Sequence, residues 1–321
     1  MKYRLILLLI SLLLLTVLLI YSDFFQVISL LLQINLTWVV LGFLLWFVGL
    51  LVRTARWRYL LSKAKIEIPF WRAARVYISG LFISNITPAK TGDPLRSVLL
   101  KAVDGKSVSS SLPSVFMERM FDVIVTIVIS IIGISFLALT HLSGWLIIAC
   151  IIYVFAFGII TYIVISEKRT KKFFRKLFSL FYFFKSVRRL ESKVERFSIE
   201  LHKAFVKYKD KKVLSVTFIY SLAVWIIEGL ILFVSFKCLG IYISPLITTA
   251  TTAITVLIAV LTFLPGGLGS SEAVTIIIYT TLFSLTASQV MAVTILARAF
   301  GYWIYVLLGA ILVGTSKYKN L

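Results

Sequence analysis

The 321-residue chain is 60% hydrophobic and has a mean hydropathy of +1.01, whereas soluble domains contain about 45–50% apolar residues. Its 34 Lys and Arg against 13 Asp and Glu give a formal net charge of +21. The basic residues fall at the ends of apolar runs and in one interior stretch, which indicates contact with anionic lipid headgroups at the cytoplasmic face and excludes a nucleic-acid partner. Composition therefore predicts an all-α polytopic membrane protein, with 1–321 as a single integral membrane domain.

The apolar runs, taken in chain order, predict about six full spans. These runs are Leu5–Tyr21, Leu36–Val52, Leu112–Thr140, Gly144–Ile165, Val213–Phe236 and Val290–Gly314. The first run follows Lys2 and Arg4 and has no small-x-small cleavage site, so we expect a retained transmembrane helix and not a signal peptide. Two further regions, about 71–103 and 244–285, are interrupted by proline and glycine and predict re-entrant hairpins made of broken helices.

The distribution of Lys and Arg predicts a multi-pass protein of the cell (plasma) membrane with cytoplasmic N- and C-termini. Segment 53–75 carries seven basic residues and segment 167–212 carries sixteen. The connections expected outside, which include Ser22–Asn35, together carry Lys237 as their one basic residue. If both arms of each hairpin crossed the membrane fully, the chain would also return to the side from which it entered. The charge counts therefore leave full crossing open as an alternative.

With re-entrant hairpins, the first would open to the cytoplasm and the second to the outside. The chain would then contain an inverted repeat. Repeat one covers approximately 36–140 and repeat two approximately 213–314, joined by a basic cytoplasmic connector at approximately 167–212.

One motif occurs at both interruptions: Pro-x-x-x-Gly, an acidic residue just after it, and then Arg-x-Phe. The broken-helix residues are Pro88 and Gly92 in the first copy and Pro265, Gly266, Gly267 and Gly269 in the second. Broken hydrophobic segments at matching places in two halves point to a transporter binding site, although proline and glycine also simply end helices. We expect both breaks to meet near the midplane and to line a cavity. Helix N-termini there attract anions, and glycines permit positive φ and the close approach of a headgroup.

Ionisable residues within the expected spans are a second indication of a polar pathway. Each costs about 2.5–3.5 kcal/mol at the bilayer centre on insertion scales unless it is paired or hydrated. The candidate substrate-binding residues are Arg96, Arg119, Arg298, Asp93, Glu118, Asp122, Glu272 and Glu228. The expected acid–base pairs, formed across the repeats, are Arg298 with Glu272 or Glu228, and Asp93 with Arg119 or Arg96. Structural ion pairs that lock helices together are the alternative for any single residue.

Motifs for enzymatic chemistry are missing from the sequence. It has no zinc-ligand spacing, no nucleotide-binding loop and no nucleophile elbow, the patterns that identify such sites. Cys150 and Cys238 fall in or at the end of apolar runs and are expected to pack as small hydrophobes. We therefore predict no enzymatic activity, no cofactor and no metal.

Four strings resemble the lysylphosphatidylglycerol synthase transmembrane family, over essentially the whole chain. They are Arg53-Thr-Ala-Arg56-Trp57, Ile86-Thr-Pro88 through Gly92-Asp93-Pro94-Leu95-Arg96, Glu118-Arg119-Met-Phe121-Asp122 and Pro265-Gly-Gly-Leu-Gly269-Ser-Ser-Glu272. Many relatives have Gly-Glu where this chain has Gly92-Asp93. The chain is similar to stand-alone members that lack the soluble aminoacyl-transfer domain.

The resemblance implies a lipid flippase that moves a lipid between leaflets by alternating access. Its substrate would be an anionic or aminoacylated phospholipid, or a polyprenyl-phosphate-linked sugar. Arg119 and Arg298, with Arg96 as a third candidate, would engage phosphate, while the acidic residues would pair with them between substrates. Two alternatives are a non-transporting membrane partner of a lipid synthase or glycosyltransferase, and an integral membrane transferase using a lipid-linked donor. The oligomeric state is left open.

Overall fold

The computed structural model of the chain describes residues 2–87, 91–137 and 210–315, with isolated residues between 151 and 208. Every regular element in these ranges is a helix, which confirms the predicted all-α class. Pro88, most of the expected span Gly144–Ile165 and most of the basic connector 167–212 lie outside the described residues.

The N-terminal segment forms two helices, α1 (Lys2–Tyr21) and α2 (Phe24–Leu32), which meet at an 80° bend. The expectation that Ser22–Asn35 is only a connection is wrong, because α2 occupies most of it. Asp23 begins α2 by accepting a hydrogen bond from the backbone N–H of Gln26 at 3.3 Å, the usual role of an N-terminal capping carboxylate.

The first half of the remaining chain contains α3 (Leu36–Lys63), α4 (Phe70–Asn85), α5 (Leu95–Asp104) and α6 (Val108–Leu137). Helix α3 continues well beyond the predicted end of its apolar run at Val52. No proline or glycine interrupts the basic run that follows, and Arg56 and Trp57 are fully buried there. This extension places both Arg53 and Arg56 inside the helix bundle.

The second half contains α11 (Lys211–Cys238), α12 (Pro245–Leu261), the short 3-10 turn η3 (Pro265–Gly267) and α13 (Ser270–Phe283). It ends with α14 (Ala287–Arg298), the π-helical turn η4 (Ala299–Trp303) and α15 (Ile304–Thr315). The last three elements form one apolar stretch of 28 residues, Ala287–Gly314.

The two halves share one order of elements: a long helix, a short helix, a break, a second short helix and a second long helix. The short helices have 16 and 10 residues in the first half and 17 and 14 in the second, fewer than the ~20 that cross a bilayer. Within the described residues, Leu36–Lys63, Lys211–Cys238 and Ala287–Gly314 are long and apolar enough to span, as is the α1–α2 pair if it counts as one span. The number of spans and the inverted relation of the halves stay predictions.

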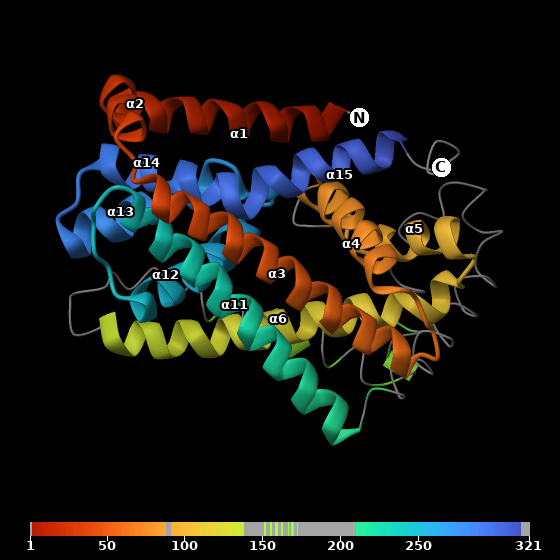
Figure 1. Ribbon diagram of the computed structural model, residues 1–321. Coiled ribbons are helices and arrows are strands. Elements are labelled where there is room, and N and C mark those ends of the chain that lie inside the picture. Colours follow the sequence, from red (N-terminus) through yellow and green to blue (C-terminus); the bar gives the residue numbers. More distant parts are fainter. Residues whose placement is uncertain are drawn as a thin grey trace.

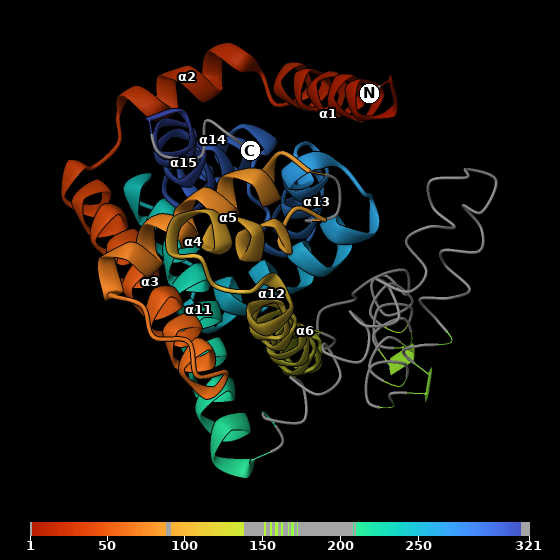
Figure 2. The ribbon, with the colours of Figure 1, turned by 90° about the vertical axis from the view of Figure 1, so that its right-hand side faces the viewer.

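Helix α11 lies at the centre of the packing, against α3, α6, α12 and α14. Figure 1 shows α3 and α11 running side by side with α6 beneath them, while α14 and α15 pass on the other side. Figure 2 views the bundle from the α4–α5 end, where α1 and α2 lie at its periphery. Small residues permit close helix contacts, since Gly229 of α11 abuts Thr249 of α12, as is common in membrane bundles. The charged residues of α3, α6 and α11 therefore face one another inside the bundle.

Candidate functional site

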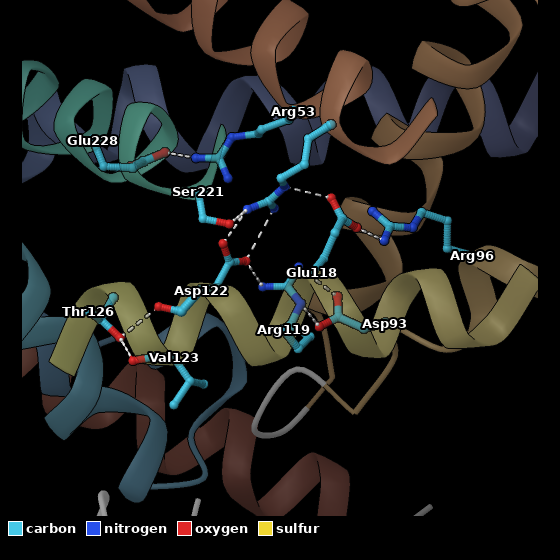
Figure 3. A network of polar contacts seen from close by, with 11 residues as sticks. Arg53, Asp93, Arg96, Glu118, Arg119, Asp122, Val123, Thr126, Ser221 and Glu228 are labelled. Carbon is cyan, nitrogen blue, oxygen red and sulfur yellow. Dashed lines mark hydrogen bonds and ion pairs between the residues drawn. The ribbon is translucent and has the colours of Figure 1, made fainter. Parts of the chain in front are cut away.

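Eight charged side chains form a network where α3, α5, α6 and α11 meet (Figure 3), in which six are linked to one another by ion pairs and Arg53 and Glu228 form a separate pair beside them. Its four arginines are Arg53, Arg56, Arg96 and Arg119, and its four carboxylates are Asp93, Glu118, Asp122 and Glu228. The formal charges of these eight groups balance, which is the condition under which ionised side chains persist in an apolar environment.

Arg56 is the centre of this network and is fully buried. Its Nε donates to Glu118 Oε1 at 3.1 Å, and its Nη1 donates to Asp122 Oδ1 at 2.5 Å. A further bond from Nη1 reaches Ser221 Oγ of α11 at 2.7 Å. Glu118 and Asp122 thus lie on one face of α6, as their i, i+4 spacing predicts, and a single arginine ties that face to α3 and α11.

Arg96 of α5 is enclosed by protein on all sides. It pairs with Glu118, and its guanidinium carbon lies 4.6 Å from the ring centroid of Trp57 and 4.5 Å from that of Tyr77. Such stacking stabilises a guanidinium in an apolar setting. The side chain is 4% exposed, so Arg96 holds α5 against α3, α4 and α6.

The first copy of the repeated motif places Arg119 beside the acidic residue that follows the break. Arg119 Nε lies 2.6 Å from Asp93 Oδ2, and two hydrogen bonds of 3.4 Å link its terminal nitrogens to Asp93 and Asp122. The Asp93–Arg119 pair is one of those expected from the sequence. The arginine side chain is 28% exposed, the highest value in the network.

A hydroxyl group stabilises the backbone at the first break. Thr87 Oγ1 accepts from Gly92 N at 2.8 Å and donates to Ser84 O at 2.9 Å. The expectation of a positive φ at Gly92 is not met. Glycine is instead required for close approach, because a Cβ there would lie 2.7 Å from Thr87 Oγ1 and 2.8 Å from Ile83 O.

In the second copy of the motif, Arg298 makes more hydrogen bonds than Arg119 makes in the first copy. Arg298 Nε donates to Glu272 Oε1 at 2.6 Å, Nη1 donates to Gly266 O at 2.9 Å, and Nη2 donates to Gly267 O at 3.0 Å. A further hydrogen bond joins Nη2 to Ser271 Oγ. Glu272 is buried and also accepts from Gly269 N at 2.8 Å. The Glu272–Arg298 ion pair therefore stabilises the whole turn.

The conformation of this turn explains its glycines. Gly266, Gly267 and Gly269 have φ values of +59°, +62° and +82°, a region that costs other L-residues about 1–2 kcal/mol. Pro265 opens the turn and is buried. The turn exposes two carbonyl oxygens to Arg298, which is why the arginine and the glycines occur together.

The acidic residue and the arginine are separated by 26 residues in both copies. Both pairs form within one copy of the motif, not across the two copies. Among the described residues, the ion pair between the halves is the one that Glu228 of α11 forms with Arg53 of α3. Glu228 was expected as one of two possible partners for Arg298; Glu272 takes that position.

A cavity of about 240 Å³ lies between the network and the second break. Six charged side chains line it: Arg53, Arg119, Arg298, Asp122, Glu228 and Glu272. Threonines and apolar residues of α12 form much of the remaining wall, and Gly266 and Gly267 contribute backbone. Asp93, Arg96, Glu118, Gly92 and Gly269 are not among the lining residues.

The two breaks approach each other at this cavity. Asn85, at the end of α4, lines it, and Tyr302 of η4 donates to Asn85 O at 3.4 Å. Helix α4 also contacts η3. The sequence-based expectation of adjacent breaks beside a cavity therefore agrees with the geometry, while their depth in a membrane stays a prediction.

Two site residues, Arg53 and Arg56, were not among the candidates from the sequence. Their position after an apolar run suggested topogenic charges at a helix end. The uninterrupted helix-compatible sequence from Val52 to Lys63 was the signal that could have placed them inside the bundle.

Comparisons with known proteins agree with this architecture. Residues 5–309 match the model of the family described as "Lysylphosphatidylglycerol synthase TM region". A UPF0104 membrane protein of Pyrococcus horikoshii is 28% identical over 97% of this chain and 96% of its own length. Another, from Methanocaldococcus jannaschii, is 26% identical over 95% and 93%. Neither name states a catalytic activity. The protein is thus a membrane protein, and it belongs to the lysylphosphatidylglycerol synthase transmembrane-region family.

Proposed function

We propose that this protein is a lipid translocase that moves a phosphate-containing lipid between leaflets by alternating access. The headgroup would occupy the cavity between the two halves, while the acyl or prenyl tails stay in the bilayer. The observation that carries the proposal is the cavity itself, where three arginines and three carboxylates meet beside two broken helices. Intramembrane charges beside broken helices are typical of substrate pathways.

The size of the cavity supports a headgroup as the occupant. Its volume of about 240 Å³ falls below the ~300–1,000 Å³ of pockets that enclose drug-sized ligands. A complete lipid would not fit, but a phosphorylated headgroup would. The threonine-rich and apolar wall formed by α12 is compatible with tails that remain outside.

The paired charges supply a reason for the arginines to stay buried when no lipid is bound. Each cavity arginine has a carboxylate partner, which offsets the cost of an isolated buried charge. A phosphate that replaces a carboxylate as the partner of an arginine forms equally directed, charge-assisted hydrogen bonds. Exchange of partners therefore provides an entry route without leaving an uncompensated cation.

Leaflet exchange in proteoliposomes tests the proposal. Fluorescent aminoacyl, anionic, zwitterionic and polyprenyl-phosphate sugar lipids would be compared, with added dithionite to quench the outer leaflet. We expect exchange that is selective for one headgroup class and strongly reduced in Arg119→Gln. The matched control is Arg72→Gln, which removes an arginine from the ion pair with Asp104, away from the cavity. Absence of exchange of every lipid by correctly folded protein would contradict the proposal and favour a non-transporting partner of a lipid-modifying enzyme.

A further inference from the structure

The three arginines on the cavity wall use their hydrogen-bond donors unequally. In Arg298, all three nitrogens donate, and two of the acceptors are backbone carbonyls of the break. Arg53 has an ion pair with Glu228, but its Nε is buried and has no hydrogen-bond partner in the described part of the chain. Arg119 Nε lies 2.6 Å from Asp93 Oδ2 and its terminal nitrogens donate to Asp93 and Asp122 at 3.4 Å, so among the described residues this arginine pairs with carboxylates and with no backbone carbonyl.

A second buried donor without a partner lies on the same wall. Trp225 Nε1 is buried and has no hydrogen-bond partner among the described residues. Trp225 precedes Glu228 by one helical turn on α11, and both line the cavity. Both of these buried atoms, Arg53 Nε and Trp225 Nε1, are donors that cannot accept. Buried donors without partners are costly, so the cavity favours a ligand rich in acceptors.

We propose that Arg53 and Arg119, with the indole N–H of Trp225, bind the monoanionic phosphodiester of the lipid headgroup. The proposal rests on the proposed translocase function and identifies the group that the cavity holds. The Arg53–Glu228 ion pair separates when the phosphodiester arrives, and Glu228 is then free to accept from a headgroup ammonium or hydroxyl. Arg298, whose three nitrogens all donate within the protein, keeps the second break closed and does not bind phosphate.

The positions of Arg53 and Glu228 suit such an exchange of partners. Their side chains are 14% and 24% exposed, whereas Arg56 and Glu118 of the central network are inaccessible. Figure 3 shows Arg53 and Glu228 on neighbouring helices at the edge of the network, away from Arg96. This pair also joins α3 to α11, so its separation is the step that couples headgroup binding to the contact between the two halves.

The two residues of this pair therefore have opposite roles toward the ligand. Glu228 competes with phosphate for Arg53, so Glu228→Gln strengthens anion binding. Arg53 supplies donors, so Arg53→Gln weakens binding. A purely structural ion pair predicts the same direction for both variants, because either one breaks the same contact.

The test uses the purified full chain in non-ionic detergent, titrated with dihexanoyl phosphatidylglycerol and followed by microscale thermophoresis. We expect Arg53→Gln to weaken binding roughly tenfold to a hundredfold, the effect of losing hydrogen bonds to a charged group. Glu228→Gln should tighten binding several-fold, while Arg72→Gln leaves it unchanged. Arg53→Lys, which keeps the charge and loses the planar fork, should fall between wild type and Arg53→Gln, even if the glutamine variant does not fold. Inorganic phosphate and dihexanoylglycerol are titrated in parallel and should bind much more weakly.

Shifts in the same direction for Arg53→Gln and Glu228→Gln would overturn the assignment. Equally tight binding of inorganic phosphate, with the same response to the variants, would show that the site binds free phosphate and would overturn the lipid source. Leaflet exchange provides the independent readout. Opposite binding shifts without exchange would support this site and contradict translocation. Exchange that is unaffected by Arg53→Gln would contradict this site and leave translocation standing.

Discussion

The two copies of the Pro-x-x-x-Gly motif solve the same structural problem with different contacts. At the second break, Arg298 binds Glu272 and two backbone carbonyls, so one side chain holds both the turn and the ion pair. At the first break, the Thr87 hydroxyl holds the described turn residues, and Arg119 pairs with Asp93 and Asp122 but with no backbone carbonyl among the described residues. An arginine that is fully engaged in holding a turn is not available to a ligand. The comparison teaches that equivalent residues of a repeat can divide into a structural and a binding role.

Removing the central arginine should have the largest effect on stability. Arg56→Leu leaves Glu118 and Asp122 with one cation fewer inside an inaccessible network. We expect the free energy of unfolding to fall by about 3–5 kcal/mol, the usual cost of an uncompensated buried charge. Denaturant unfolding in detergent micelles measures this loss. A change below about 1 kcal/mol would mean that the remaining arginines rearrange to neutralise both carboxylates.

Two double-mutant cycles would measure how the coupling energy of the ion pair differs between the two motif copies. The coupling energy between Glu272→Gln and Arg298→Gln should reach about 2–3 kcal/mol, whereas that between Asp93→Asn and Arg119→Gln should be about 1 kcal/mol. The physical reason is exposure: the side chains of Arg119 and Asp93 are 28% and 10% exposed, against 15% and 4% for Arg298 and Glu272. Unfolding of the four single and two double variants gives both values. Equal coupling would remove the basis for assigning different roles to the two arginines.

Removing the hydroxyl that stabilises the first break should cause a smaller loss in the free energy of unfolding. Thr87→Val keeps the shape but leaves Gly92 N without its acceptor, which costs about 1–2 kcal/mol for a buried amide. The matched control is Thr16→Val on α1, where the hydroxyl donates to Leu12 O in an exposed position and less than about 0.5 kcal/mol is expected. Thermal unfolding compares the two variants. Identical small losses would indicate that other contacts hold the first break.

The smallest effect should come from the ion pair outside the network. Arg72 is 50% exposed and pairs with Asp104 at 2.7 Å, so Arg72→Gln should cost less than about 1 kcal/mol. Added salt should reduce the difference in free energy of unfolding between this variant and the wild type, because exposed charges are screened. A loss as large as that of Arg56→Leu would show that burial does not separate the two kinds of ion pair.

Hydropathy located most helices closely, because long apolar runs and Pro or Gly interruptions are local properties. The expected run Val213–Phe236 lies within α11, and Asp93–Arg119 and Glu272–Arg298 are among the partners expected, although each pair forms within one motif copy and not across the repeats. The α2 helix was missed although its sequence is apolar, because the 80° bend after α1, the capping by Asp23 and the packing on α14 that make it a separate helix are not visible in hydropathy.

The contacts made by the basic end of α3 could not be predicted in the same way. Arg53 and Arg56 resemble the topogenic charges that follow many membrane spans, and only the packing of α3 against α11 and α6 shows their carboxylate partners. The cavity likewise depends on how eight helices converge: α3, α4, α6, α11, α12, α13, α14 and α15. Sequence separations of up to 175 residues, as between Arg53 and Glu228, lie beyond any local pattern.

The equality of four arginines and four carboxylates in the central network constrains how this protein can diverge. A single substitution that neutralises one of these groups leaves an unbalanced charge among apolar helices. Tolerated changes at these positions should therefore arrive in pairs, one basic and one acidic residue together, or not at all. Across descendants of a common ancestor, Arg56 should vary together with Glu118 or Asp122, while exposed Arg72 drifts independently.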